Sequence, residues 1–284
     1  MAAPPADDIL PAHTEITDDE LTEISTILNM WRGINMSAYK DKCMKRRVAI
    51  RMRSTRSHDA AEYCNLLRQS PLELDLLQKA LTIHVSQFFR NPSMFDKLRG
   101  DVFPELFSSC IKNDTGKVRI WCLGCAGGEE PFSLAIILKE YFSKELRKVQ
   151  TIIHGTDIDA ETVRSAQQGE YLEERLKEVP KELRERYFRP SGTRFRVVPE
   201  LREMVSFQQG DITRTKEYAA SDLAVCRNTL IYFTRHDQEK ILHGIADILP
   251  SGGILVLGKS ETLVGGVRQR FEAICPVERM YRRL

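Results

Sequence analysis

Residues 123–131 read Leu-Gly-Cys-Ala-Gly-Gly-Glu-Glu-Pro, a glycine-rich turn that joins a predicted strand to a predicted helix. The residues before it, 117–122, alternate and branch like a buried strand, and residues 132–138 continue as an apolar helix. Glycines at the carboxyl end of a parallel strand let the backbone approach a ligand, and the following helix N-terminus offers N–H groups. The stretch therefore predicts a nucleotide-sized ligand, with an ordinary glycine-rich turn as the alternative.

The composition of this turn favours one class of ligand. Ala126 stands where a dinucleotide site has its second glycine, and no Gly-Lys-Ser/Thr follows for a phosphate loop. Glu129 and Glu130 would repel a phosphate, but carboxylates accept hydrogen bonds from an amino group or a ribose hydroxyl. S-adenosylmethionine carries both of these groups and no phosphate, so the turn favours this cofactor over NAD and ATP.

Acidic side chains follow the next predicted strands. Asp157 ends the second strand and can accept from both ribose hydroxyls, while Asp159 is a candidate helix cap. Asp211 follows the third strand and can accept from the adenine amino group. Four strand ends thus converge at one edge of a sheet; the predicted strands are 117–122, 151–156, 204–208 and 222–226.

Five sequence segments occur in an order that is hard to obtain by chance. They are Ser86-Gln87-Phe88-Phe89-Arg90, Gly128-Glu129-Glu130-Pro131-Phe132-Ser133, Gly155-Thr156-Asp157-Ile158-Asp159, Cys226-Arg227-Asn228 with Ile231-Tyr232-Phe233, and Gly258-Lys259-Ser260-Glu261. The chain thereby resembles the chemotaxis receptor glutamate O-methyltransferases, the CheR family, which transfer a methyl group from S-adenosylmethionine to receptor glutamates. The resemblance spans about residues 80–261, and the preceding helical region is similar in layout.

The resemblance implies a fold and a domain order. The expected fold is α/β, a class I S-adenosylmethionine-dependent methyltransferase with a Rossmann-like sheet, an N-terminal all-helical domain and a small inserted antiparallel β-subdomain. We expect the helical domain over residues 1–87, with residues 1–14 disordered, and a linker over residues 88–116. The catalytic domain then covers residues 117–284, with the inserted subdomain at about 170–203.

The resemblance also implies the site residues. The reaction centre falls on Arg90 and Tyr232, which in the family lie beside the transferable methyl group. The chain departs from the family pattern at His84 and Lys259, where the family often has Asn and His, so the contribution of these two positions is open. The implied cofactor-binding residues are His84, Ser86, Arg90, Glu130, Asp157, Asp211, Ile212, Arg227 and Asn228.

The implied reaction asks little acid–base chemistry of the protein. A glutamate side chain is ionised at neutral pH and can attack the methyl carbon directly, so no general base is needed. In-line positioning in a water-poor site favours the transfer, which yields a glutamate methyl ester and S-adenosylhomocysteine. Arg90 could orient a carboxylate, and Tyr232 could position the sulfonium through its hydroxyl or ring face. The implied biological role is signal transduction in chemosensory adaptation.

Charge is unevenly distributed along the chain, although the net charge is only +2. Residues 1–23 carry seven acids and no Lys or Arg, whereas residues 40–56 carry eight basic residues against Asp41. Such a run is typical of a solvated helix face, but helical spacing also predicts a positive stripe that attracts an acidic partner. Because receptor methylation helices are rich in glutamate, the predicted substrate-docking residues are Lys42, Lys45, Arg46 and Arg53.

Composition bounds the remaining predictions. With 42% hydrophobic and 29% charged residues, no run of 18 apolar residues and no charged-then-apolar start, we expect a cytoplasmic protein that does not insert into a membrane. The seven cysteines suit a reducing compartment, and Cys122 with Cys125 lacks a second pair at zinc spacing, so no metal is expected. We expect a monomer. Tethering by a receptor tail is doubtful, because the turn at residues 189–193 is shorter and less glycine-rich than in the family members that grip one.

Two other functions stay open at this point. A nucleic-acid methyltransferase would place its catalytic tetrapeptide at residues 227–230, but the Pro-Pro-aromatic sequence that stacks a flipped base is missing, and no aromatic residues interleave the basic stripe. A non-catalytic cofactor-binding scaffold would keep the fold for partner recognition. The presence of Arg90 and Tyr232 favours the enzyme over the scaffold.

Overall fold

The computed structural model describes residues 16–34, 36–82 and 86–284. The chain divides into two compact units, residues 1–83 and residues 84–284. The expected disorder of residues 1–14 concerns a segment outside the described residues.

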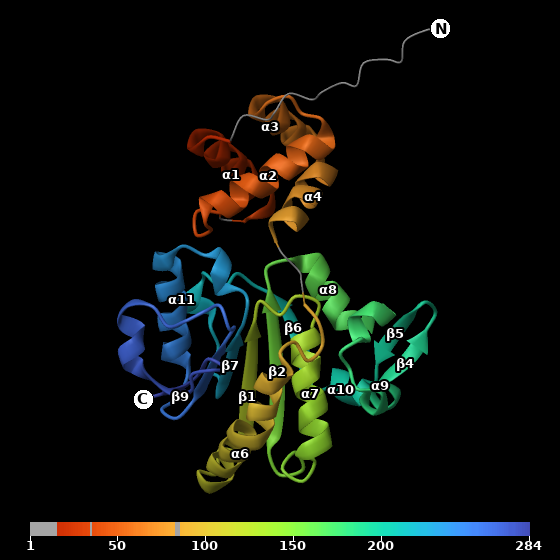
Figure 1. The fold of residues 1–284 in the computed structure, drawn as a ribbon, viewed down its shortest axis with the longest axis vertical. Coiled ribbons are helices and arrows are strands. Elements are labelled where there is room, and N and C mark those ends of the chain that lie inside the picture. The colour runs from red at the N-terminus through yellow and green to blue at the C-terminus, as the bar shows by residue number, and fades with distance from the viewer. Residues whose placement is uncertain (1–15, 35, 83–85) are drawn as a thin grey trace. The chain divides into compact units, whose positions relative to one another are not determined.

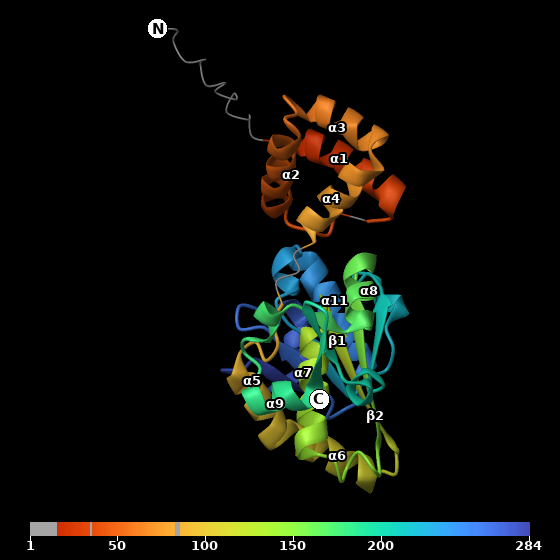
Figure 2. The ribbon, with the colours of Figure 1, turned by 90° about the vertical axis from the view of Figure 1, so that its right-hand side faces the viewer.

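The described part of the first unit consists of helices (Figures 1 and 2), and α1, α3 and α4 each begin at a side-chain N-cap. Thr17 and Glu20 form a capping box at the start of the first helix, and Ser70 caps the last one, where Pro71 takes the first helical position. The acidic run at residues 18–20 and Pro71 are sequence signals of helix starts, and helices begin at both places. The helices are α1 (Asp18–Arg32), α2 (Asp41–Thr55), α3 (Ala60–Gln69) and α4 (Pro71–Leu81).

A buried carboxylate joins three of these helices. Glu73 of α4 forms an ion pair with Arg51 of α2, with 2.6 Å between Nη2 and Oε2. The hydroxyl of Tyr63 in α3 donates to Glu73 Oε1 at 2.8 Å. Burial raises the pKa of Tyr63, so its hydroxyl keeps the proton that it donates. Because Arg51 is paired with Glu73 inside the unit, it does not contribute to the exposed positive charge of α2.

The second unit is an α/β domain around a seven-stranded sheet (Figure 1). The strand order is β6-β2-β1-β7-β8-β10-β9, in which β10 alone runs antiparallel to its neighbours. The predicted core strands at residues 117–122, 151–156, 204–208 and 222–226 are confirmed, and the last two strands of the chain form an antiparallel hairpin. The strands are β1 (Lys117–Leu123), β2 (Gln150–Asp157), β6 (Val205–Gln209), β7 (Leu223–Cys226), β8 (Ile254–Leu257), β9 (Phe271–Cys275) and β10 (Met280–Arg283).

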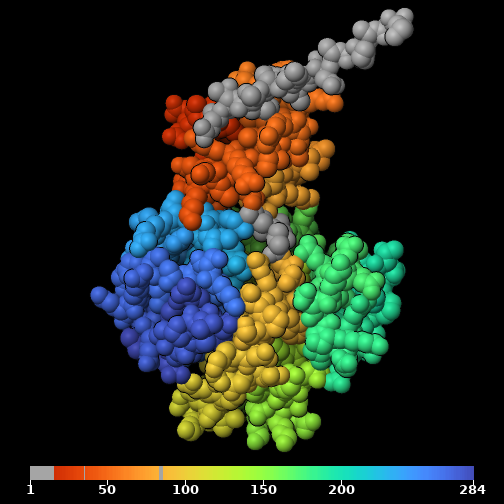
Figure 3. Space-filling view, in the orientation of Figure 1, coloured from red at the N-terminus to blue at the C-terminus, as the bar shows by residue number. Residues whose placement is uncertain are grey.

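Helices complete the core of this unit. Residues 88–116, expected as a linker, contain α5, η1 and α6, whose Phe95, Phe103 and Phe107 are buried in the core. Figure 3 shows part of this segment at the surface between the C-terminal strands and the inserted subdomain. The helices are α5 (Pro92–Lys97), the π-helix η1 (Leu98–Val102), α6 (Phe103–Lys112), α7 (Glu129–Tyr141), α8 (Ala160–Gln168) and α11 (Arg235–Ile248), with the short η3 (Thr215–Glu217), η4 (Leu230–Tyr232) and η5 (Gly265–Arg270).

The inserted subdomain lies at one flank of the second unit, beside α7 and α8 (Figure 1). Its antiparallel sheet has the order β3-β5-β4, so the predicted insertion is confirmed. The elements are β3 (Glu170–Tyr171), η2 (Glu173–Leu176), α9 (Lys181–Tyr187), β4 (Phe188–Ser191), β5 (Arg194–Val197) and α10 (Pro199–Arg202).

Two features are absent from the described residues. No helix there is long and apolar enough to cross a membrane. No group of three or more His, Cys, Asp or Glu side chains there is arranged to hold a metal ion.

Candidate functional site

The glycine-rich turn after β1 is tightly packed on both sides. Gly124 and Gly128 adopt left-handed conformations, with φ of 72° and 87°. A Cβ on Gly124 would overlap the side chain of Thr229, and one on Gly128 would lie 2.8 Å from the ring of Phe207. Ala126 also has a positive φ, 47°, which is strained for a residue with a side chain. The turn therefore requires glycine where the sequence has it, and it brings β1 against the segment after β7.

Asp157 lies at the carboxyl end of β2, beside the turn. It is buried, and its Oδ2 accepts from the backbone N of Ala126 at 2.9 Å, while its Oδ1 accepts from the N of Asp159 at 3.1 Å. Asp159 accepts from the first N–H groups of α8, so its predicted capping role is confirmed. A carboxylate has about four acceptor positions. The two bonds of Asp157 to the backbone are thus compatible with the ribose contact predicted for it.

Asp211 and Ile212 follow β6 at the same edge of the sheet. Asp211 Oδ1 accepts from both the backbone N and the hydroxyl of Thr213, at 2.8 Å each. Ile212 is buried, and its carbonyl accepts from the hydroxyl of Tyr218. The predicted adenine-binding segment is therefore an internally bonded turn.

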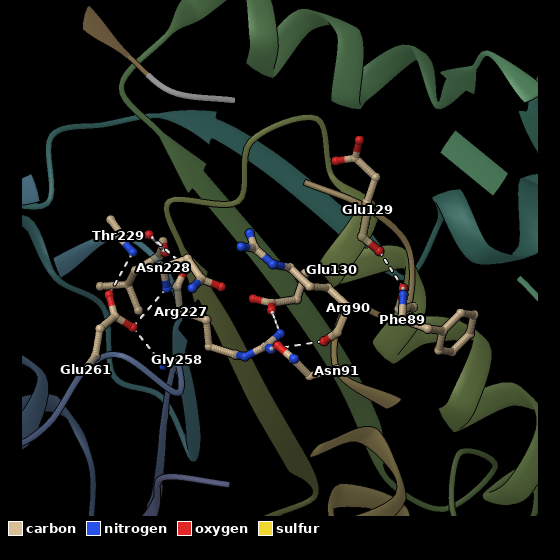
Figure 4. Close-up of polar contacts among 12 residues, drawn as sticks. Phe89, Arg90, Asn91, Glu129, Glu130, Arg227, Asn228, Thr229, Gly258 and Glu261 are labelled. Atoms are coloured by element: carbon tan, nitrogen blue, oxygen red, sulfur yellow. Dashed lines mark hydrogen bonds and ion pairs between the residues drawn. The ribbon is translucent and has the colours of Figure 1, made fainter. Parts of the chain in front are cut away.

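Arg227 is the centre of a buried polar cluster (Figure 4). Its Nη1 lies 2.6 Å from Glu130 Oε2 of α7. Its Nη2 donates to the carbonyl of Arg90 at 3.0 Å and to Asn91 Oδ1 at 2.6 Å. The Arg227 side chain is only 3% exposed, and Nε has no partner among the described residues. Arg227 and Glu130, both predicted to contact the cofactor, thus bond each other and fix the segment that carries Arg90.

The segment of Arg90 is held in an unusual backbone conformation. Phe89 and Asn91 have φ of 52° and 65°, which costs energy in residues other than glycine. The Phe89 N–H donates to Ser133 Oγ at 3.0 Å, and Ser133 Oγ donates to the carbonyl of Glu129 at 2.7 Å. In the view of Figure 4, the Glu130 carboxylate is drawn between the guanidinium groups of Arg227 and Arg90.

Two further residues of the predicted site are Tyr232, predicted for the reaction centre, and Ser86, predicted to bind the cofactor. Tyr232 is half-buried in η4, five positions beyond Arg227. Ser86 is half-buried, and its carbonyl accepts from Arg175 of η2. The predicted cofactor residue His84 lies outside the described residues. Asn228 follows β7 with a φ of 56°.

Glu261 binds the turn after β7 from below (Figure 4). Its Oε2 accepts from the backbone N of Asn228 and of Gly258, at 2.8 and 2.7 Å. Its Oε1 accepts from the N of Thr229 and of Leu230, also at 2.8 and 2.7 Å. Glu261 is 4% exposed, and burial raises its pKa while the four backbone bonds oppose that rise.

The inserted subdomain reaches the same site. The ring of Phe88 meets those of Tyr171 and Phe188 edge-on, at centroid distances of 4.9 and 5.2 Å. The Tyr171 hydroxyl donates to the carbonyl of Gly127 in the glycine-rich turn at 2.6 Å, and burial raises its pKa. A cavity of about 280 Å³ lies between the turn, α8 and the subdomain, lined by Glu129 among other residues.

The two cysteines near the turn are packing groups. Cys122 and Cys125 are buried, and burial raises the pKa of both thiols, so they stay protonated at neutral pH. Lys259, the departure from the family pattern, lies 3.5 Å from the buried carboxylate of Glu278. Glu278 also accepts from the hydroxyl of Ser93 at 2.8 Å, so Lys259 faces an anion next to α5.

The predicted docking residues of α2 fall into two groups. Lys42, Arg46 and Arg53 are exposed, and the described residues offer them no ion partner. Lys45 is half-buried and pairs with Asp18 at 2.6 Å. Arg47, which was not predicted for docking, donates to the carbonyls at the end of α4.

Several site residues were not predicted from the sequence. Asn91, Tyr171 and Arg175 act through contacts between segments far apart in the chain, and no local pattern marks them. Ser133 ends the matched segment of residues 128–133, but its bond to the Phe89 N–H was not predicted. Glu261 had a signal, because it ends the matched segment of residues 258–261, but no function could be attached to it.

The arrangement fits S-adenosylmethionine. The glycine positions leave no room for a Cβ, so the turn presents backbone rather than side chains, as close approach of a ligand requires. Asp157 and Asp211 supply acceptors at successive strand ends, and no cationic phosphate cradle accompanies them among the residues of the turn.

Comparisons with known proteins agree with this geometry. Residues 84–278 match the family model described as CheR methyltransferase, SAM binding domain, and residues 19–82 match CheR methyltransferase, all-alpha domain. A chemotaxis protein methyltransferase of Listeria innocua is 33% identical over 82% of this chain and 86% of its own length, and one of Borreliella burgdorferi is 30% identical over 92% and 93%. An uncharacterized 104.1 kDa protein of Rhodobacter capsulatus is 31% identical over 94% of this chain, which spans 28% of that protein.

Proposed function

Because the chain belongs to the CheR methyltransferase family and is an S-adenosylmethionine-dependent methyltransferase, we propose that it methylates glutamate side chains of chemotaxis receptors. The products are glutamate methyl esters and S-adenosylhomocysteine, and the biological role is chemosensory adaptation. The naming of similar proteins as chemotaxis protein methyltransferases supports the receptor as substrate.

One observation carries the proposal for the site. Arg227 at the end of β7 binds both Glu130 beside the glycine-rich turn and the carbonyl of Arg90, at 2.6 and 3.0 Å. The predicted reaction-centre residue Arg90 is thereby tied to the same sheet edge as the predicted ribose acceptor Asp157. Glu130, Arg227 and the segment of Arg90, which were predicted from three separate parts of the sequence, thus form one connected cluster, and this supports the proposed site.

The chemistry follows from these positions. Bound S-adenosylmethionine supplies a methyl group on a positively charged sulfur. A carboxylate oxygen of the receptor forms a bond to the methyl carbon as the carbon–sulfur bond breaks, and the electron pair of that bond stays on sulfur. No proton moves, so the protein contributes orientation through Arg90 and Tyr232 and exclusion of water through buried rings such as Phe88.

Substrate docking is proposed for the exposed basic side chains of α2. Lys42, Arg46 and Arg53 are exposed on this helix and attract an acidic receptor segment. Lys45 contributes less, because Asp18 already neutralises it at 2.6 Å. The Arg46→Glu variant should therefore raise the KM for the receptor at low salt, and Lys112→Glu on α6 is the matched exposed control.

The decisive experiment follows methyl label from S-adenosylmethionine into a purified receptor cytoplasmic domain. We expect base-labile label that disappears when the receptor glutamates are replaced by alanine and that falls strongly with Arg90→Ala. Tyr232→Phe separates a contribution of the hydroxyl from one of the ring. Cofactor binding without transfer to any cognate receptor would contradict the proposal and favour a scaffold.

A further inference from the structure

Glu261 ends the matched segment of residues 258–261. No residue of this segment was predicted to bind the cofactor or to take part in the reaction. We propose that Glu261 is a positioning residue, whose buried carboxylate holds the backbone of residues 228–230 in the geometry that cofactor binding and transfer need. The inference rests on the proposed function, because it assigns Glu261 to the same site. It adds a structural requirement to that site without placing Glu261 in contact with substrate.

The hydrogen bonds require an ionised carboxylate. Both oxygens of Glu261 accept two backbone N–H groups each, and all four distances are 2.7–2.8 Å. A proton on either oxygen would point at an N–H donor. The side chain is 4% exposed, so water does not replace these bonds. Four donors around one anion form a backbone nest, which compensates the cost of burying the charge.

The turn that Glu261 binds is strained and crowded. Asn228 has a φ of 56°, and the N–H groups of three consecutive residues, 228–230, point at the same carboxylate. Without the anion these partly or fully buried donors would lose their acceptor, which is unfavourable. Thr229 packs where a Cβ on Gly124 would be, so a shifted turn would collide with the glycine-rich turn.

The same turn carries predicted site residues on both sides. Arg227 precedes it and holds the carbonyl of Arg90, and Tyr232 follows it in η4. The Gln238 side chain of α11 donates to the carbonyls of Leu230 and Phe233, at 2.8 and 3.1 Å. Glu261 therefore accepts the N–H groups of this segment while Gln238 donates to its carbonyls, and the pair fixes the path from Arg227 to Tyr232.

Gly258 provides an independent way to disturb the anion. A Cβ there would lie 2.7 Å from Glu261 Oε2 and 2.9 Å from the Asn228 backbone N. No left-handed φ is required of Gly258, so alanine is compatible with its backbone. Gly258→Ala thus pushes on the bond between Glu261 and Asn228 without changing either residue.

Asp222 is a matched control at the other end of the same strand. It precedes β7 and accepts from the backbone N of Arg119 at 2.8 Å, besides pairing with the Arg119 guanidinium. Its carboxylate therefore also accepts a backbone N–H, that of Arg119 in the neighbouring strand β1. This contact lies at the start of β7, whereas the site lies beyond the end of β7. Asp222→Asn should lower the free energy of unfolding without changing the affinity for the cofactor.

The experiment measures binding of S-adenosylmethionine and S-adenosylhomocysteine by calorimetry, with amide hydrogen exchange of residues 228–230. Glu261→Gln turns one oxygen into a donor that faces N–H groups. At a temperature where the variant is folded, we expect ~10-fold weaker binding of both ligands and faster exchange of these amides. Glu261→Asp and Gly258→Ala should show smaller changes in the same direction, and Asp222→Asn should bind as the wild type does.

Two outcomes would overturn the inference. One is a folded Glu261→Gln variant with wild-type affinity and wild-type kcat. The other is an Asp222→Asn variant that loses affinity equally, which would mean a general loss of stability. If Glu261→Gln does not fold, Glu261→Asp and Gly258→Ala decide the matter by the same readouts. Wild-type protein that binds the cofactor but labels no receptor would contradict the proposed function and leave this test intact.

Discussion

The candidate site has two sides that are held by different kinds of interaction. On the β7 side, Arg227 and Glu261 bind the chain through hydrogen bonds of 2.6–3.0 Å. On the subdomain side, Phe88 packs edge-on against Tyr171 and Phe188. A buried ion loses its bonds when its shape or charge changes, whereas ring packing depends on volume and tolerates similar side chains. The β7 side should therefore fix the positions of the polar groups in the site. The subdomain side should fill the space beside the site and exclude water from it.

The largest effect is expected from Arg227→Met. The variant leaves Glu130 without its cation and removes the donor to the Arg90 carbonyl. We expect a loss of about 4 kcal/mol in the free energy of unfolding, as for one broken partner of a buried ion pair, and a fall of about 100-fold in kcat/KM. Denaturant unfolding and the methyl-transfer assay measure the two quantities.

Arg227→Lys sharpens this test. A lysine ammonium cannot reproduce the planar fork that binds Glu130, Arg90 and Asn91 together, so this variant should lose nearly as much transfer activity as the methionine variant. Arg119→Met is the matched control, because Arg119 pairs with Asp222 at the opposite end of β7 and is 44% exposed. If lysine restores most of the activity, charge alone matters on this side.

The next largest effect is expected at Phe88, which is fully buried. Phe88→Ala should cost about 3 kcal/mol, because the ring leaves a cavity against Tyr171 and Phe188. Phe88→Leu should cost only about 1 kcal/mol and keep most of the transfer activity, since it retains most of the volume. Thermal unfolding measures the stability of the two variants, and kcat measures their transfer activity. A leucine variant as damaged as the alanine variant would show that the ring geometry, rather than its volume, is needed.

A smaller effect is expected from Tyr171→Phe, which keeps the ring and removes the hydrogen bond from its hydroxyl to the glycine-rich turn. The lost bond from the hydroxyl to the Gly127 carbonyl, 2.6 Å long, should cost about 1–2 kcal/mol in stability. Because Gly127 belongs to the predicted cofactor turn, affinity for S-adenosylhomocysteine should fall a few-fold. Unchanged affinity, measured by calorimetry, would confine the subdomain to a structural contribution.

The sequence predicted those parts of the fold that depend on interactions between residues close in the chain. The strand before Gly124 and the helix after Gly128 follow from their apolar periodicity, and Asp159 was a recognisable cap. These features depend on residues close in sequence, so a single chain contains enough information to place them.

The remaining contacts depend on how distant segments meet. Three of the four bonds of Glu261 join residues 31–33 positions apart, and the Tyr171 contact joins residues 44 apart. The basic run of α2 shows the same limit, since its charge pattern did not separate the exposed Arg46 from Lys45, which Asp18 neutralises. Which charges face inward is set by tertiary packing.

The smallest expected effect is the coupling between the two sides. Phe88 and Arg90 lie in one short segment, with the ring of Phe88 held by the subdomain and the carbonyl of Arg90 held by Arg227. A change on either side should therefore reach the other through this backbone. We expect Phe88→Leu and Arg227→Lys to be non-additive by about 1 kcal/mol in a double-mutant cycle on cofactor affinity. Additivity within about 0.3 kcal/mol would show that the two sides act independently, with Ser133 and the strained backbone at Phe89 insulating one from the other.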